Sequence, residues 1–313
     1  MPDIVVMFFV LGVVAGVVRS DLSIPKAAYD ILSLLLMLTI GLKGGMALHG
    51  SLNPALLKEL AGVTLLGITI PLVVFPVVRY LVRLSLADSA SLAAHYGSVS
   101  AGTFAVALAY VEANQLVAGG QVTLYLVLLE LPAIVLGLML YRHFSRDKAT
   151  THSSSLWHGT LTNRGVILLV GGVLIGWLYG PNAGESVTSL YTGAFQGVLA
   201  LFLLEMGLVA ADTLRSLRWE HCRLVLFALT APAVLSCFGL LMACWLDLPG
   251  GSAVILASLT ASASYIAAPV AIRTAIPSAN IGLAMLASLG LTFPFNVLIG
   301  IPLYHNFWQW LTG

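Results

Sequence analysis

Charged residues are scarce in this sequence of 313 residues. They make up 9% of the chain, whereas hydrophobic residues make up 59%, and the mean hydropathy is +0.99. Soluble domains carry roughly 25% charged residues, so this composition excludes an ordinary soluble domain. The formal net charge is +1 and there is no acidic or basic block, which gives no reason to expect nucleic acid as a partner.

Cysteine and the sequence motifs of enzymes are also lacking. Cys222, Cys237 and Cys244 show no CxxC spacing, so neither a disulfide framework nor a zinc site is predicted. The chain has no HExxH, no GxGD aspartate pair and no glycine-rich phosphate loop. We therefore expect neither an enzyme nor a bound cofactor, and no metal other than a possible sodium ion.

Long apolar runs are what the sequence has instead. No Asp, Glu, Lys or Arg occurs between Asp88 and Glu112, between Arg164 and Glu185, or after Arg273. Each such run supplies the roughly 20 apolar residues that a helix needs to cross a bilayer. The sequence predicts an all-α polytopic membrane protein with about ten transmembrane spans, near residues 4–18, 29–48, 60–82, 89–111, 119–141, 165–180, 190–213, 223–246, 251–272 and 279–303.

The basic residues indicate the orientation of these spans. With ten spans, twelve of the 14 Lys and Arg residues fall on one side, Lys58 falls on the other and Lys43 lies within a span. The positive-inside rule then predicts that both termini lie outside the cytoplasm of a cell (inner) membrane. The polar stretch 142–164 becomes a cytoplasmic linker between two halves, 1–141 and 165–313.

The two halves share short similar segments at a nearly constant offset. "IGLKGGMAL" (40–48) resembles "MGLVAADTL" (206–214), "SAGTFA" (100–105) resembles "SASYIA" (262–267), and "LPAIVLG" resembles "FPFNVLIG". Five spans per half is an odd number, so the second half enters the membrane from the opposite face. Two inverted five-span repeats are typical of secondary transporters.

Serine, glycine and proline interrupt spans 4 and 9 at matched positions. We predict broken helices there, with free N–H groups at the start of each second half-helix forming a site for a small anion. Hydroxyl groups would complete the contacts, and the residues that carry them are Ser98, Ser100, Thr103, Ser262 and Ser264. In the alternative interpretation, the small residues only allow close helix packing.

Titratable residues within the spans are candidates for ion coupling, because charges inside a membrane are costly and usually functional. Glu130, which precedes Pro132, could bind a cation or carry a proton. Lys43 could attract an anion or pair with Glu130 or Glu205 as a structural bridge, and a structural role is the main alternative for Glu205. His95, just before the first break, could carry protons or be a packed neutral residue.

The segments "LSIPKAAYDILSLLLMLTIGLKGGMAL", "GSVSAGTFAVALAYVEANQ", "LELPAIV", "MGLVAA" and "IRTAIPSANIGLAM" together resemble the cyanobacterial sodium-dependent bicarbonate transporter family. The resemblance covers nearly the whole chain in the same order. It implies a homotrimer in which a transport domain moves against a scaffold, in the elevator manner. Bicarbonate would bind between the broken helices, with sodium beside it.

Carried over residue by residue, the resemblance places the anion contacts on Ser98, Ser100, Ala101, Gly102, Thr103, Ser262, Ala263 and Ser264. Where those proteins carry an aspartate that helps to hold sodium, this chain has Tyr265, so Tyr265 joins Glu130, Lys43 and Glu205 among the ion-coupling candidates. The resemblance also implies regulation by a PII-like protein. The 142–164 connection is shorter than in those proteins, which weakens this expectation.

The sequence thus predicts a secondary active transporter of a small anion in membrane lipid, with sodium-dependent bicarbonate uptake as the first hypothesis. The alternative is another small monocarboxylate or related anion, driven by protons through Glu130 or His95. An ion channel is a further alternative of a different class.

Overall fold

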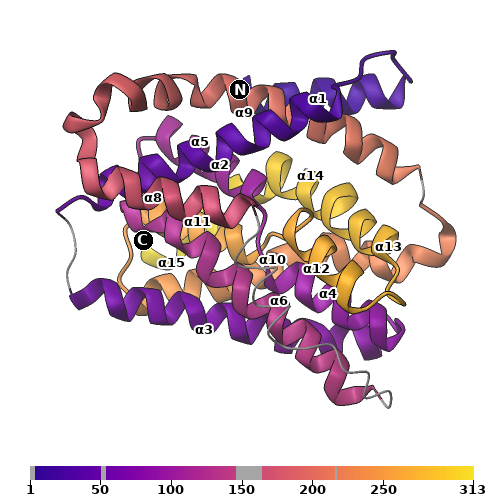
Figure 1. The fold of residues 1–313 in the computed structure, drawn as a ribbon. Helices are drawn as coiled ribbons and strands as arrows, with labels where there is room; N and C mark the ends of the chain where they lie inside the picture. The colour runs from indigo at the N-terminus through magenta and orange to yellow at the C-terminus, as the bar shows by residue number, and fades with distance from the viewer. Residues whose placement is uncertain (1–3, 51–53, 146–163, 216) are drawn as a thin grey trace.

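The computed structural model describes residues 4–50, 54–145, 164–215 and 217–313, and they fold almost entirely into helices (Figure 1). The helices are α1 Ile4–Val17, α2 Lys26–Leu48, α3 Pro54–Pro76, α4 Leu86–Gly97, α5 Ala101–Ala113, α6 Leu124–Phe144, α8 Arg164–Ala183, α9 Glu185–Leu214, α10 Cys222–Trp245, α11 Gly250–Thr260, α12 Ala267–Ala275, α13 Ile281–Met285, α14 Phe293–Phe295 and α15 Ile301–Thr312.

The positions of the helices agree with the ten predicted segments. Within the described residues, seven helical segments are long and apolar enough to cross a membrane, and three shorter apolar helices lie at 4–17, 167–183 and 250–260. These ten segments fall on the ten predicted spans. The all-helical prediction is confirmed, whereas the ten-span topology and the internal repeat remain predictions. Most of the predicted linker, residues 146–163, lies outside the described residues.

Two groups of helices pack closely. The first group contains α1, α2, α8 and α9; within it α2 packs along α8, and α1 packs along α9. The second group contains α3, α4 and α6, which pack on one another, and α5, α10, α11 and α15. In this second group α11 contacts α5, α10 and α15. In Figure 1 the first group lies towards the top of the view and α3, α4 and α6 towards the bottom. The predicted spans 1, 2, 6 and 7 therefore pack together as one group.

In the first group, the backbones of α2 and α8 lie in close contact. A Cβ atom on Gly172 would lie 2.9 Å from the carbonyl oxygen of Leu38 and 3.0 Å from the Cα of Gly41. Small residues at such contacts let membrane helices pack backbone to backbone, where van der Waals contact replaces the hydrophobic effect. The contact of α2 with α8 therefore depends on glycine at this crossing.

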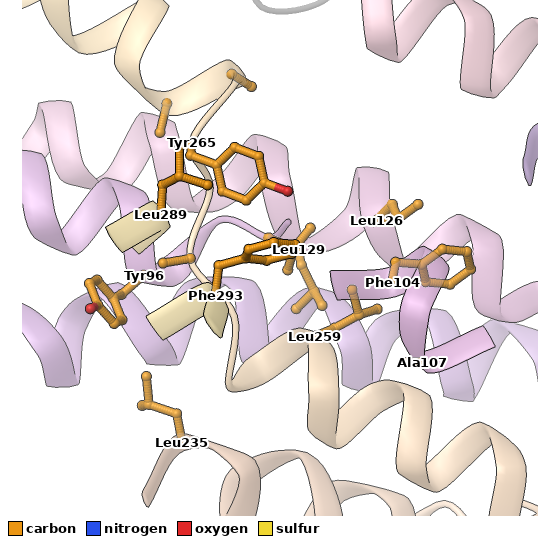
Figure 2. Packing of buried hydrophobic residues seen from close by; sticks show 14 of the residues in the cluster. Tyr96, Phe104, Ala107, Leu126, Leu129, Leu235, Leu259, Tyr265, Leu289 and Phe293 are labelled. Carbon is orange, nitrogen blue, oxygen red and sulfur yellow. The ribbon is translucent and has the colours of Figure 1, made fainter. Parts of the chain in front are cut away.

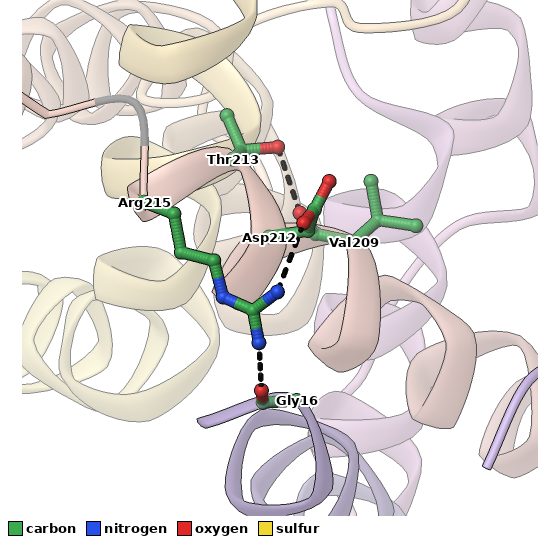
Figure 3. Close-up of polar contacts among 5 residues, drawn as sticks. All are labelled: Gly16, Val209, Asp212, Thr213 and Arg215. Atoms are coloured by element: carbon green, nitrogen blue, oxygen red, sulfur yellow. Dashed lines mark hydrogen bonds and ion pairs between the residues drawn. The ribbon is translucent and has the colours of Figure 1, made fainter. Parts of the chain in front are cut away.

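A side chain also joins α1 to α9. Arg215, just after α9, donates to the carbonyl oxygen of Gly16 in the last turn of α1 at 2.5 Å and lies 3.3 Å from a carboxylate oxygen of Asp212 (Figure 3). The last carbonyls of a helix have no partner within the helix. The Gly16 carbonyl accepts from the backbone N–H of Arg19 at 3.2 Å and also from the guanidinium group, whose charge complements the helix dipole.

The predicted span 4 is the most enclosed of the seven long helical segments in the described residues. In its most apolar stretch 94% of residues are buried, compared with 50% to 67% for the other long segments. This segment consists of α4 and α5, which are separated by three residues that are not helical. The interruption therefore lies in the protein interior, where non-helical backbone at membrane depth is tolerated only when it is enclosed by protein or lines a cavity.

Candidate functional site

The first break separates α4 from α5. Helix α4 ends at Gly97, and the following residues are extended, with φ −79° and ψ 171° at Ser98 and φ −102° and ψ 116° at Ser100. Ser100 caps α5, because its Oγ accepts a hydrogen bond from the N–H of Thr103 at 3.0 Å. The sequence "GSVSAGT" thus ends one helix and begins another, as predicted.

The second break separates α11 from α12. Helix α11 ends at Thr260, and Ser262, Ala263 and Ser264 lie in the connection that follows. The Oγ of Ser262 donates to the carbonyl of Leu259 at 2.8 Å, and the Oγ of Ser264 accepts from the N–H of Ala268 at 3.2 Å. The hydroxyl of Ser264 therefore satisfies an N–H group that the start of α12 leaves free, whereas the carbonyl of Leu259 also accepts from the backbone N–H of Ser262 at 3.0 Å.

The two breaks are bonded directly to each other. The N–H of Ser100 donates to the Oγ of Ser262 at 3.0 Å, and the N–H of Ser264 donates to the carbonyl of His95 at 2.7 Å. Ser100 and Ser262 are 162 residues apart and are the first residues of the matched segments "SAGTFA" and "SASYIA". These contacts bring the two breaks, which the sequence analysis paired, next to each other.

Several polar side chains at the breaks are buried without a hydrogen bond. Among the described residues, the buried side-chain atoms without a partner are His95 Nε2, Ser98 Oγ, Thr103 Oγ1 and Tyr265 Oη. Buried polar groups in proteins are nearly always hydrogen-bonded, so each exception needs an explanation. All four lie at or beside the breaks, which is the arrangement expected of a site that awaits a polar ligand.

The histidine can be assigned a tautomer. His95 Nδ1 lies 2.7 Å from the carbonyl oxygen of Ser91, and because a carbonyl only accepts, Nδ1 carries the proton in the neutral ring. The unpartnered Nε2 is then an acceptor. His95 is fully buried, so the structure agrees with both predicted alternatives, a packed neutral residue and a proton carrier.

A cavity of about 280 Å³ lies against the breaks. Ser100 and Ala101 line it from the first break, Ser264 and Tyr265 from the second, and Glu130 from α6. The remaining lining is mainly apolar, from α2, α6, α8 and α12. Its volume is near the lower end of the roughly 300–1,000 Å³ of small-molecule sites, which suits a small ligand.

Tyr265 is held at the meeting point of these elements. Its ring packs edge-on against Phe293, with centroids 5.4 Å apart (Figure 2). Its hydroxyl faces the start of α5, since a Cβ atom on Gly102 would overlap the phenol oxygen. Only glycine therefore fits at position 102 beside this tyrosine.

The predicted anion-contact residues come together, but they divide into two sets. Ser100, Ala101 and Ser264 line the cavity, together with the ion-coupling candidates Glu130 and Tyr265. The other anion-contact candidates are buried in and around the two breaks and do not line the cavity; they are Ser98, Gly102, Thr103, Ser262 and Ala263.

Lys43 and Glu205 lie apart from this cavity. Lys43 pairs with Glu112 at 2.5 Å, rather than with Glu130 or Glu205, and its ammonium group lies 4.4 Å from the centre of the Phe195 ring. Lys43 therefore forms an ion pair, but its partner differs from the two carboxylates that the sequence suggested. The reason is that α2 passes the end of α5 and not the middle of α6. Glu205 is partly exposed on α9.

Two residues of the site were missed by sequence reasoning. Ser33 on α2 lines the cavity, and Asn296 donates to the carbonyl of Ala261 at 2.9 Å at the end of α11 while its own oxygen accepts from Tyr304 at 2.6 Å. Ser33 is a single serine in an apolar run and gives no signal. Asn296 could have been noticed as an unusual amide within the apolar segment "FPFNVLIG".

Comparison with known proteins decides the family. The family model described as the Na+-dependent bicarbonate transporter superfamily matches residues 4–309. The chain belongs to this superfamily. It is therefore a multi-pass membrane protein of a transporter family and not an enzyme, as predicted. The comparison with curated proteins produced no match for this member of the superfamily.

Proposed function

We propose that this protein is a secondary active transporter that takes up a small anion, with bicarbonate as the substrate and sodium as the coupling ion. One observation carries the proposal: two broken helices meet in the buried centre, bonded through Ser100 and Ser262, beside a cavity and unpartnered hydroxyl groups. Membership of the superfamily supports the choice of bicarbonate and sodium.

The anion would bind at the start of α5. The first N–H groups of a helix have no partner within the helix, and the helix dipole places partial positive charge there. Ser98 and Thr103 contribute hydroxyl groups that are still free to donate. These groups can hold a bicarbonate ion without an arginine or lysine.

The cation would bind in the cavity that lies against the breaks. Sodium is a hard cation that takes oxygen ligands, and the cavity offers the carboxylate of Glu130 with the hydroxyl groups of Ser100 and Ser264. Glu130 has no ion-pair partner among the described residues. In this arrangement Glu130 supplies the negative charge that the second break lacks.

Alternating access would follow from movement of the helix group containing the breaks against α1, α2, α8 and α9. We propose that this elevator motion occurs in two inverted repeats, residues 1–141 and 165–313, within a homotrimer in the cell (inner) membrane, with both termini outside the cytoplasm. The 142–164 linker would then face the cytoplasm, where a PII-like regulator would reach it.

Uptake of radiolabelled bicarbonate into proteoliposomes tests the proposal. A sodium gradient is expected to drive accumulation above the level reached with choline in place of sodium. No uptake under either condition would remove bicarbonate as the substrate. Conductance far above transporter turnover in planar bilayers would instead indicate a channel.

A second candidate is proton-driven transport of another small monocarboxylate or related anion. It is favoured by the tyrosine at position 265, where the resembled proteins carry an aspartate, and by the two titratable residues near the breaks, Glu130 and His95. An uptake rate that does not depend on sodium and that a protonophore abolishes would support this candidate over sodium coupling.

A further inference from the structure

The side chain of Tyr265 is fixed in position, whereas its hydroxyl makes no well-formed hydrogen bond with the described residues and lies beside the Ser100 side chain and the Gly102 backbone. The residue is 6% exposed, its ring packs against Phe293, and its phenol oxygen has no well-formed hydrogen bond among the described residues. A side chain that served only to fill space would not need a hydroxyl group there, because an unpartnered buried hydroxyl is unfavourable.

Other buried tyrosines of the protein satisfy their hydroxyl groups. Tyr96 lies 2.7 Å from the hydroxyl of Thr292, Tyr304 donates to Asn296 at 2.6 Å, and Tyr125 donates to Glu59. The fold therefore pairs buried phenol groups where it can. Tyr265 differs from these three because its hydroxyl faces the proposed ligand site.

The hydroxyl of Tyr265 points towards the start of α5. It fills the space that glycine leaves at position 102, in the first turn of α5. In that turn the N–H of Thr103 is bonded to the Oγ of Ser100 and the N–H of Phe104 to the carbonyl of Ser100. The N–H groups of Ala101 and Gly102 precede these and have no partner within the helix.

Donors of three kinds thus lie at or beside the start of this 13-residue helix: backbone N–H groups, the hydroxyl groups of Ser98 and Thr103, and the phenol of Tyr265. A neutral phenol donates a hydrogen bond and brings no negative charge to repel an anion. Planar oxyanions, whose oxygen atoms accept several hydrogen bonds at once, match this set of donors better than a halide ion does.

We propose that the hydroxyl of Tyr265 donates a hydrogen bond to the oxyanion bound at the start of α5, which makes Tyr265 a specificity-determining residue of the transporter. The inference rests on the function proposed above and adds a named ligand to its anion site. It gives Tyr265 a role towards the anion, in addition to any role towards a coupling ion.

Two phenylalanine variants of the full-length protein separate a binding role from a structural one. Tyr265→Phe removes the unpartnered hydroxyl, and Tyr96→Phe is the matched control, because that buried hydroxyl is bonded and points the opposite way in Figure 2. Binding of radiolabelled bicarbonate and the melting temperature without ligand are measured for both variants, with formate, nitrate and chloride as competitors.

Tyr265→Phe is expected to weaken bicarbonate binding by about tenfold, the effect of one hydrogen bond to a charged group, and to leave the melting temperature unchanged or higher. Tyr96→Phe is expected to lower the melting temperature and to keep wild-type affinity. Formate and nitrate should compete better than chloride, and should lose that advantage in Tyr265→Phe.

The outcomes distinguish this inference from the proposed function. Wild-type affinity in Tyr265→Phe, in a protein that binds bicarbonate, would overturn the role of Tyr265 and leave the transport proposal standing. A wild-type protein that binds none of the oxyanions would overturn both. A ring-fluorinated tyrosine at position 265 keeps the native shape, and a fluorine resonance that does not respond to saturating bicarbonate would likewise contradict the proposed contact.

Discussion

At the scale of single residues, the break in the first long buried segment is explained by hydrogen bonds that its serines make. Ser100 plays two parts, since its Oγ caps α5 and its N–H reaches Ser262 on the other break. Serine is suited to this position because its short side chain competes with helical hydrogen bonding and bonds to the nearby backbone instead. The same residue thus begins a helix and links two distant parts of the chain.

Removal of the hydroxyl at Ser262 tests this link. Ser262→Ala leaves the buried N–H of Ser100 without an acceptor, so we expect the free energy of unfolding to fall by about 1–3 kcal/mol. Anion binding should weaken as well, and Ser100→Ala should weaken it too. Ser258→Ala is the control, because the Oγ of Ser258 bonds only to the carbonyl of Val254 within α11. Wild-type anion affinity in both Ser100→Ala and Ser262→Ala would refute the site assignment.

A second residue-scale prediction concerns Gly102. Gly102→Ala drives a methyl group into the phenol oxygen of Tyr265, and we expect a loss of about 1–3 kcal/mol in stability. Adding Tyr265→Phe should restore part of that loss, which a double-mutant cycle of melting curves measures. Gly193→Ala on α9, where nothing lies within 4 Å, should cost no stability. Strictly additive effects of the two changes would contradict the close approach of Tyr265 to Gly102.

At the scale of elements, one ion pair joins the two helix groups. Lys43 belongs to α2 and Glu112 to α5, and Phe195 of α9 lies under the ammonium group. Both side chains are partly exposed, so the pair contributes about 0–1 kcal/mol to stability. Its position matters more than its strength, because it crosses the boundary at which the proposed elevator motion takes place.

We therefore expect Lys43→Met to change the rate of anion uptake by more than it changes the melting temperature. The exchanged pair, Lys43→Glu with Glu112→Lys, should recover part of the wild-type rate, since it restores attraction across the same contact. Proteoliposome uptake and thermal unfolding of the same preparations provide the two measurements. Asp212→Asn is a suitable control, because the Asp212 pair with Arg215 is formed within three residues of one chain segment. An equal change of rate in that control would argue against a specific role for the cross-group pair.

At the scale of the whole molecule, the packing of α2 on α8 depends on backbone contact at Gly172. Gly172→Val would drive a side chain into the backbone near Leu38 and Gly41, and we expect a loss of at least about 1–3 kcal/mol and a poorly monodisperse protein. The neighbouring Gly171→Val is the matched control, since nothing lies within 4 Å of a Cβ atom at that position. Melting curves and size-exclusion profiles compare the two, and equal stability would show that the α2 contact is not close-packed.

Much of the helical arrangement was predictable because long apolar runs must form helices if they are to cross a bilayer. The two breaks were also predictable, since serine and glycine at matched positions signal both a weakened helix and a partner elsewhere. The partner of Lys43 was not predictable, because the sequence suggested Glu130 or Glu205 and only the packing of α2 beside α5 selected Glu112. Ser33 was missed for a similar reason, as nothing local distinguishes it.

The sequence by itself determined the class of molecule, the positions of its helices, the two interruptions and the family, because these depend on composition, on runs of apolar residues and on motifs that stay together along the chain. Tertiary structure alone decided which polar groups are left over when the helices pack. The orphaned hydroxyl of Tyr265, the bond from Ser100 to Ser262 and the cavity beside Glu130 each require residues distant in sequence to meet. Whether a buried polar group has a hydrogen-bond partner depends on these long-range contacts, and no local sequence pattern predicts them.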